Sequence, residues 1–102
     1  MEKYQNQKVI IRSDRAGVFY GEIAHQEQLG DKLMVDMKDC RRLWYWDGAA
    51  SLSQLAKEGT TAPVNCKFTV TVPRMTIMGV IEIIPCSDKA IQSIEKVAVW
   101  KR

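Results

Sequence analysis

The most unusual stretch of this chain is CRRLWYWDGAASLSQLA, residues 40–56, which places two arginines beside three aromatic residues. A guanidinium group presents a planar fork of N–H donors that grips phosphate oxygens in pairs, and an indole ring stacks on a purine. A strand that only packs a core needs no pair of cations beside two tryptophans. The stretch therefore predicts a binding site for a small phosphorylated ligand, with Arg41, Arg42, Trp44 and Trp46 as its side chains.

The two arginines are consecutive, so on an extended strand they point to opposite sides and only one needs to reach a given pocket. If the strand continues through this stretch, Arg42 shares a side with both tryptophans. Arg42 or Arg41 would then hold phosphate while an aromatic ring stacks on a base. In the structural alternative, the arginines pair with Asp36 or Asp39 and the tryptophans are buried under a helix.

The four residues from Gly48 to Ser51 have small side chains, so a ligand can approach their backbone N–H groups. They lead into a Ser-x-x-Gln capping box formed by Ser51 and Gln54, and a helix dipole favours an anion at such a start. Gly48 and Ser51 are therefore candidate ligand-binding positions. Asp47 acts against this interpretation, because its carboxylate can occupy the same donors.

Two more arginines are secondary candidates. Arg12 lies with Asp14 and Arg15 in the predicted first turn, and Arg74 follows Pro73 in the segment PRMT, which we interpret as a loop. Either loop could close over a ligand. Taken alone, each arginine is more typical of a solvated surface residue.

Catalytic and metal-binding patterns are not found in the sequence. The chain has three scattered cysteines and one histidine, His25, without a C-x-x-C spacing, which is typical of reduced core thiols. A tetrahedral metal site would require Cys40, Cys66, Cys86 and His25 to converge. Motifs of the G-x-S-x-G, H-E-x-x-H and Walker types are also missing. We expect no metal, no cofactor and no enzymatic activity.

The composition is that of one globular domain, which we assign to residues 1–102, with 46% hydrophobic and 26% charged residues. The formal net charge of +3 suits a small phosphorylated ligand, whereas proteins that bind long nucleic acids usually carry a denser stripe of cations. No apolar run approaches the ~20 residues of a membrane span, and the N-terminus lacks a signal-peptide core. We therefore expect a cytoplasmic protein with neither a membrane nor a long nucleic acid as partner.

β-Branched and aromatic residues predict the strands that must position these side chains. Phe19 should mark the core side of a hairpin closed by the SDRA turn. Strands are predicted at residues 8–11, 17–24, 32–40, 68–72 and 79–84, with Pro73 ending the fourth and residues 97–102 as a candidate edge strand.

Two helices complete the prediction. The first begins at Ser51 and ends at Gly59, and the second is capped by Ser87 or Asp88 and carries apolar residues at helical spacing. Because so many strands are adjacent in sequence, the sheet should be largely antiparallel, with the helices on one face or at one end. The fold class is therefore α+β, a small single domain of mainly antiparallel β-sheet with two short helices.

The run CRRLWYWDGAASLSQLA, followed by GTTAP, CKFTVTV, GVIEIIPCSDKA and VAVWKR, resembles the Thoeris anti-defence sponge family. The resemblance spans about residues 8–102. The family's Arg-Arg-Leu-Trp positions fall on Arg41, Arg42, Leu43 and Trp44, and Cys40 stands where the family pattern has alanine.

This resemblance implies a phage-encoded, non-catalytic protein in the host bacterial cytoplasm. Such sponges bind cyclic ADP-ribose-type signals made by host TIR-domain enzymes and hold them intact, so that the immune effector is not activated. Family members form homodimers, some of which assemble into hexamers, and some also bind cyclic oligonucleotides at separate sites. The alternative hypothesis is a non-catalytic interaction module that binds a host protein or single-stranded RNA through the same basic and aromatic patch.

Overall fold

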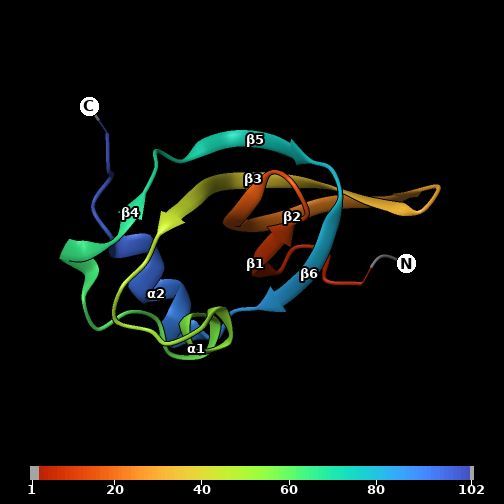
Figure 1. Ribbon diagram of the computed structural model, residues 1–102. Helices are drawn as coiled ribbons and strands as arrows, with labels where there is room; N and C mark the ends of the chain where they lie inside the picture. Colours follow the sequence, from red (N-terminus) through yellow and green to blue (C-terminus); the bar gives the residue numbers. More distant parts are fainter. Residues whose placement is uncertain (1–2, 102) are drawn as a thin grey trace.

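The computed structural model describes residues 3–101, in which a curled antiparallel sheet carries two α-helices at one end (Figure 1). Its elements are β1 (Lys8–Ser13), β2 (Gly17–Leu29), β3 (Lys32–Tyr45), α1 (Leu52–Glu58), the 3-10 helix η1 (Pro63–Asn65), β4 (Lys67–Phe68), β5 (Val72–Ile77), β6 (Val80–Pro85) and α2 (Asp88–Lys96). This arrangement confirms the predicted α+β fold class.

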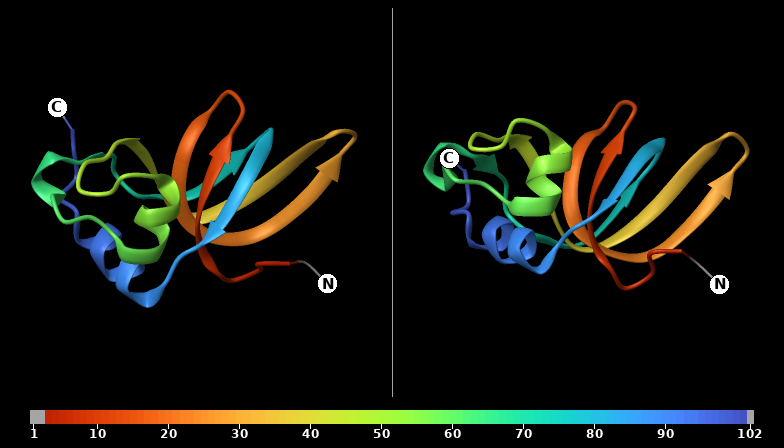
Figure 2. Two further views of the ribbon diagram at one scale, coloured as in Figure 1. Left: turned by 60° about the horizontal axis from the view of Figure 1, so that its bottom comes forward. Right: turned by 90° about the horizontal axis from the view of Figure 1, so that it is seen from below.

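The long strand β3 organises the sheet. The strand order in the sheet is β4-β3-β2-β1-β6, and β5 also pairs with β3. Every one of these strand pairs is antiparallel. The strands β5 and β6 are joined only by Met78 and Gly79, yet β5 pairs with β3 and β6 pairs with β1. The sheet therefore curls strongly, as Figure 2 shows, with the helices at the end away from the hairpin tips.

The curl gives the sheet two buried sides. The inner cluster is made only of strand residues, namely Val9, Ile11, Phe19, Ile23, Val35, Met37, Cys40, Ile77 and Val80. The helix-side cluster joins Ile10, Tyr20 and Leu43 of the sheet to Leu55, Ala56, Cys66, Phe68, Ala90, Ile94 and Val97. The prediction that the Phe19 side is the core side was therefore incomplete. Tyr20 is also buried, because the helices cover the second side of β2.

Both helices begin as predicted. The Ser51 hydroxyl accepts a hydrogen bond from the Gln54 N–H at 3.1 Å, and the Ser87 hydroxyl accepts one from the Ala90 N–H at 3.1 Å. Gly59 ends α1 with a positive φ of 78°. Ser87 also donates from its hydroxyl to the Lys57 carbonyl at 2.6 Å, which holds the start of α2 against the last turn of α1.

The prediction for residues 68–77 was wrong. Instead of one strand ended by Pro73 and a PRMT loop, the chain forms the two-residue β4, a gap and then β5, which contains Pro73 and Arg74. A proline is tolerated in β5 because this strand pairs with β3 alone. The candidate edge strand at residues 97–102 is reduced to one isolated bridge between Phe68 and Val99, and residue 102 lies outside the described residues.

A bulge in β3 decides where the following side chains point. Between Lys38 and Arg41 this strand has one residue more than β2 opposite it, and Asp39 adopts a positive φ of 49°. Regular alternation from Met37 would place Arg41 on the inner side. Because of the extra residue, Cys40 enters the inner cluster and Arg41 turns to the helix side.

Among residues 3–101, no helix has the length and apolar character needed to cross a bilayer.

Candidate functional site

The structure places Arg41 in the interior, where only 4% of it is exposed. Its Nη1 donates to the carbonyls of Ile94 at 3.1 Å and Val97 at 3.0 Å, at the end of α2. Its Nη2 donates to the Phe68 carbonyl at 3.1 Å, and its Nε to the Thr69 carbonyl at 3.0 Å. One guanidinium thus joins the C-terminus of α2 to the segment after β4.

This environment removes Arg41 from the candidate ligand-binding residues. Its donors are used by backbone carbonyls, and burial lowers the pKa of its guanidinium. The cation also stabilises the helix end, where the carbonyl dipoles are negative. The structural alternative, a pairing with Asp36 or Asp39, does not hold for Arg41 either, because the partners are carbonyls and not carboxylates.

Arg42 lies on the opposite side of β3 and is half-buried. Its Cζ is 4.5 Å from the centroid of the Phe19 ring, and its Nη1 donates to the Ala16 carbonyl. A guanidinium has five N–H donors, and within residues 3–101 Arg42 gives only this side-chain hydrogen bond and pairs with no carboxylate. Its charge is therefore held in place by the Phe19 ring while most of its donors remain available.

Two shallow depressions border Arg42, one on each side. The first, of about 460 Å³, is lined by Arg15, Ala16, Phe19, Arg42, the end of β5 from Met75 to Ile77, and Met78. The second, of about 400 Å³, is lined by Ala16, Gly17, Val18, Arg42, Leu43, Trp44 and Trp46. Each is within the size range of small-molecule sites. Arg42 is the cation common to both.

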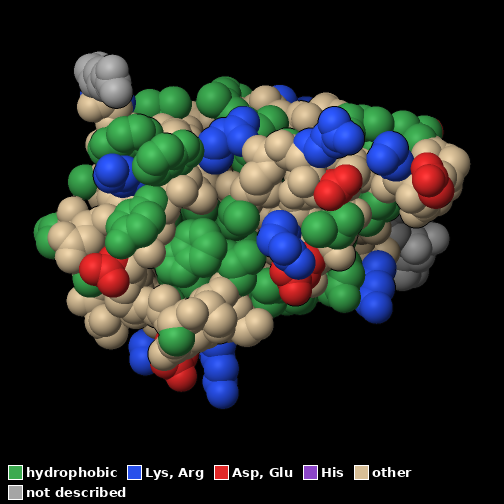
Figure 3. Space-filling model, viewed as in Figure 1, with side chains coloured by type: hydrophobic (Ala, Val, Ile, Leu, Met, Phe, Trp, Pro, Cys, Tyr) green, Lys and Arg blue, Asp and Glu red, His purple; other side chains and the backbone are tan. Residues whose placement is uncertain are grey.

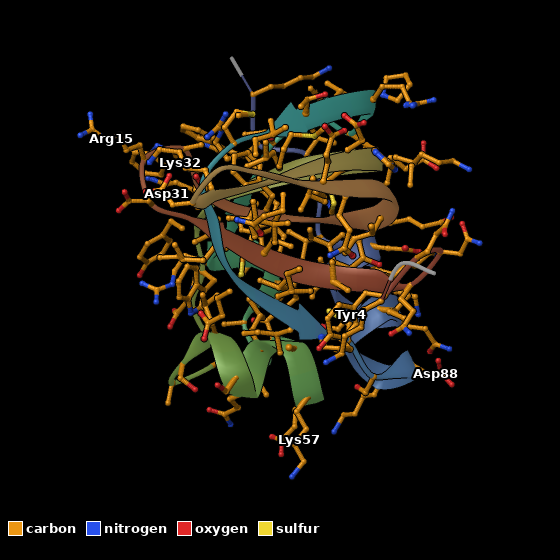
Figure 4. All side chains as sticks on the ribbon, turned by 90° about the vertical axis from the view of Figure 1, so that its right-hand side faces the viewer. Tyr4, Arg15, Asp31, Lys32, Lys57 and Asp88 are labelled. Carbon is orange, nitrogen blue, oxygen red and sulfur yellow. The ribbon has the colours of Figure 1, made fainter. Side chains whose placement is uncertain are left out.

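Arg15 was predicted to lie in the first turn but was not selected as a ligand-binding residue. It lies in the β1–β2 turn, is exposed, and lines the first depression as well as a neighbouring one beside Lys32. Figure 4 shows its side chain projecting away from the ribbon into solvent. Its position in a polar turn gave no signal that the sheet would bring it toward Arg42.

The two arginines predicted to lie in loops are strand residues, so neither can close over a ligand as a loop would. Arg12 lies in β1, and its Nε is 3.1 Å from Oε1 of Glu82 on β6, an exposed ion pair. Arg74 lies in β5 opposite Lys38 of β3 and is exposed. Neither residue lines the depressions beside Arg42.

The two tryptophans have different environments. Trp46 is half-buried, packs against the helix-side cluster and lines the second depression. Trp44 is 59% exposed, and its ring stacks on that of Trp100 with centroids 5.3 Å apart. Figure 3 shows hydrophobic side chains gathered over β4 and the end of β3, with Lys and Arg side chains among them. The structural alternative placed both tryptophans under a helix. It does not hold for Trp44, which is exposed, and it holds only in part for Trp46, which is half-buried.

The small residues before α1 do not form the expected cradle of backbone donors. The Gly48 N–H donates to Oδ1 of Asp47 at 2.9 Å, and the Ala50 N–H to Oε1 of Gln54 at 2.7 Å. A Cβ at Gly48 would lie 2.5 Å from the backbone nitrogen of Ala62, so glycine is required there for chain packing. Ser51 serves as the N-cap of α1. Gly48 and Ser51 are therefore structural residues.

A separate polar cleft of about 320 Å³ lies on the helix side between β1, β2 and α2. Oε2 of Glu95 accepts hydrogen bonds from Lys8 Nζ at 2.8 Å and from the Tyr20 hydroxyl at 2.6 Å. Burial acts to raise the pKa of Glu95, but these two donors lower it below its ordinary value. The pKa of Tyr20 is raised, mainly by burial and to a smaller extent by its hydrogen bond to Glu95. These groups satisfy one another.

The cysteines are free, and Cys40 and Cys66 are buried. Burial raises the pKa of Cys40 and of Cys86 to about 12, so both remain protonated thiols at neutral pH. In the part of the chain that the structure describes, no three side chains of His, Cys, Asp or Glu are grouped so that they could hold a metal ion. The chemistry available at the surface is thus a cation with free donors beside aromatic rings.

The comparisons with known proteins give a family but no function. The model of a family described as a domain of unknown function, DUF6948, matches residues 6–94. Neither the curated proteins nor the solved structures give a match. The matched range includes both depressions beside Arg42 and ends before Trp100.

Proposed function

The chain belongs to the DUF6948 family, a domain of unknown function, and we propose that it binds a cyclic ADP-ribose-type nucleotide beside Arg42 without cleaving it. In this proposal Arg42 holds the diphosphate and Trp46, which lines the same depression, stacks on the base. Arg15 is a second cation that can approach the ligand from the β1–β2 turn. Gly48, Ser51 and Arg41, which the sequence suggested, have no part in it.

The observation that carries the proposal is the state of the Arg42 guanidinium. It stands over the Phe19 ring, gives one side-chain hydrogen bond, to the Ala16 carbonyl, and borders both depressions. Because its position is fixed before a ligand arrives, little side-chain entropy is lost on binding. A forked donor pair can then meet two phosphate oxygens at once.

Binding without turnover fits the side chains that surround Arg42. The first depression is lined by Arg15, Phe19 and methionines, and the second by small and apolar residues with Trp44 and Trp46. Neither lining contains a carboxylate, a histidine or a cysteine. We propose that the protein sequesters its ligand in the host bacterial cytoplasm, as a phage anti-defence homodimer or homohexamer, and thereby blocks an immune effector.

The test combines calorimetry with recovery of the ligand. Purified protein is titrated with a cyclic ADP-ribose, then heat-denatured, and the released nucleotide is identified by mass spectrometry. We expect saturable binding and recovery of the unchanged nucleotide. Recovery of a cleaved product would show an enzyme, and an absence of heat of binding across the isomers of cyclic ADP-ribose would overturn the proposal.

Two alanine variants locate the site. Arg42→Ala should lose at least about tenfold in affinity, since a hydrogen bond to a charged group contributes about 1.5–3 kcal/mol. Arg74→Ala is the matched control, because Arg74 is an exposed arginine outside both depressions. Equal affinities for the two variants would place the ligand elsewhere.

The same titration separates the alternative function. An interaction module for a host protein would show no heat with the nucleotide but would retain a protein in a pull-down. A module for single-stranded RNA alone would likewise show no heat with the nucleotide, but would bind oligonucleotides with a marked salt dependence.

A further inference from the structure

A second surface, which adjoins the second depression at Trp44 but does not include Arg42, is formed by Trp44, Trp100 and Lys67, and we call it the indole platform. Trp44 and Trp100 are 59% and 38% exposed, and their rings are stacked with an interplanar angle of 23°. The Nζ of Lys67 lies 5.2 Å from the Trp44 ring centroid and 5.5 Å from that of Trp100. Tyr45, 47% exposed, lies 6.0 Å from the same Nζ.

Backbone contacts hold the platform in place before any partner arrives. Lys67 of β4 pairs with Tyr45 of β3, and the Trp100 N–H donates to the Phe68 carbonyl at 2.9 Å. Three segments distant in sequence thus meet at one edge of the sheet. Their aromatic rings remain exposed although the fold has two well-buried clusters, so packing alone does not explain their placement.

The segments that form the platform carry positive charge, and the acidic Asp47 that adjoins them accepts a hydrogen bond from Asn65 Nδ2 at 3.0 Å. Residues 41–46, 64–73 and 97–101, which supply the platform and its flanks, contain no Asp or Glu but do contain Arg42, Lys67 and Lys101. A partner that brings negative charge and flat rings matches both features. Bases stack on exposed indoles, and a nearby ammonium group attracts the phosphate that links them.

We propose that the indole platform binds a short single-stranded stretch of nucleic acid, with a base stacked on Trp44 or Trp100 and a backbone phosphate beside Lys67. Stacking is tolerant of base identity, so the platform should favour no particular sequence. Association with a second copy through this surface is disfavoured, because a two-fold contact places each patch on its own equivalent and therefore Lys67 near its own counterpart.

The test measures the fluorescence anisotropy of a short fluorescein-labelled oligouridylate titrated with the full chain. Trp100→Ala should weaken binding about tenfold or more, and Trp100→Phe should retain much of it, because a ring remains for stacking. Lys67→Gln should weaken binding several-fold and reduce the slope of log K against log salt by about 0.7, the value for one phosphate contact on a single strand.

Matched controls keep the result interpretable. Ile81→Ala removes another exposed apolar side chain, 57% exposed, and Lys57→Gln removes an exposed cation on α1. Both should bind as the wild type does, and circular dichroism checks the folding of every variant. Trp100→Ala and Lys67→Gln should keep full affinity for the cyclic nucleotide, whereas Arg42→Ala should lose it. Each variant should therefore weaken the binding of one ligand only, so the two proposals are tested separately.

Two outcomes would overturn the proposal. One is a failure to detect platform binding: either the wild type gives no anisotropy change at low salt, or Trp100→Ala and Lys67→Gln bind the oligouridylate as well as the control variants do. The other is that light scattering shows a dimer that Trp100→Ala dissociates while the oligouridylate does not bind, which would assign the platform to a second copy of the chain.

Discussion

Arg41 and Arg42 are neighbours in the chain, yet the two sides of β3 use them in opposite ways. On the helix side, Arg41 donates to four backbone carbonyls and is almost fully buried. On the other side, Arg42 rests on the Phe19 ring with one side-chain hydrogen bond. An arginine whose donors are used by the protein holds the fold together, whereas one whose donors are unused can hold a ligand.

The same contrast extends beyond the two arginines. On the helix side, Lys8, Tyr20 and Glu95 form a network that satisfies its own charges. On the side of Arg42, the exposed Arg15 borders an open depression with no ionic partner among the described residues. Polar groups on the first side should therefore affect stability, and those on the second side should affect binding.

The largest expected effect comes from Arg41→Ala. Removal of the guanidinium leaves the carbonyls of Phe68, Thr69, Ile94 and Val97 without this donor. The loss of unfolding free energy should be about 3–5 kcal/mol. Urea denaturation followed by circular dichroism measures it. Arg41→Lys keeps the charge but not the fork, and should recover only part of the loss; a change below about 1 kcal/mol for Arg41→Ala would contradict the structural role.

The next effect concerns the bulge that separates the two arginines. Asp39 has a φ of 49°, a conformation that a β-branched residue adopts only with strain. Asp39→Val should therefore cost about 1–2 kcal/mol, whereas Asp39→Gly should change stability by less than about 0.5 kcal/mol. Thermal denaturation of the two variants compares them. Equal stabilities of Asp39→Val and Asp39→Gly would contradict the strain expected from the positive φ at this position.

Arg42→Ala should affect stability less. The side chain is half-buried, and its contacts are the Phe19 ring and one carbonyl. The expected loss is about 1 kcal/mol or less, which shifts the melting temperature by a few degrees. Differential scanning calorimetry of Arg42→Ala beside Arg41→Ala gives the comparison directly. If both variants unfold equally easily, Arg42 is a structural residue as well.

The smallest effect concerns pH. The pKa of Glu95 is lowered, so its contribution is present above the unfolded value of about 4.3 and is lost as pH falls through the folded value. Its side chain is 44% exposed, so Glu95→Gln should cost only about 0.5 kcal/mol or less at neutral pH. In urea titrations, the difference between wild type and variant should shrink as the pH falls below the unfolded pKa of Glu95 and should vanish once the pH is below the folded pKa. A difference that persists in acid would exclude the ionised network as its cause.

Local sequence patterns predicted much of the fold. The starts of β2 and β3, the cap at Ser51 and the glycine at position 59 were predicted correctly, because each depends on neighbours along the chain. The ends were not, since β2 and β3 continue to Leu29 and Tyr45, beyond the predicted residues 24 and 40. The division of residues 68–77 into β4 and β5 was not predicted, because both strands pair with β3, which is far away in sequence.

The site was predicted only in its residue types. The sequence singled out the Arg-Arg-Leu-Trp run, and Arg42, Trp44 and Trp46 do border one depression. It did not select Arg15, Lys67 or Trp100 as site residues, because they reach this surface through a turn, a short strand and the C-terminal segment. Such proximity is created by sheet curvature and has no counterpart in spacing along the chain.

The sequence by itself determined that this chain would form an antiparallel sheet with two capped helices and would carry a dense cluster of cations and rings. Only the tertiary structure decided which arginine would be buried. One extra residue at Asp39 reverses the alternation of β3, and the helices cover the side to which Arg41 then points. Because side chains alternate with a period of two, a single inserted residue exchanges the roles of two adjacent arginines.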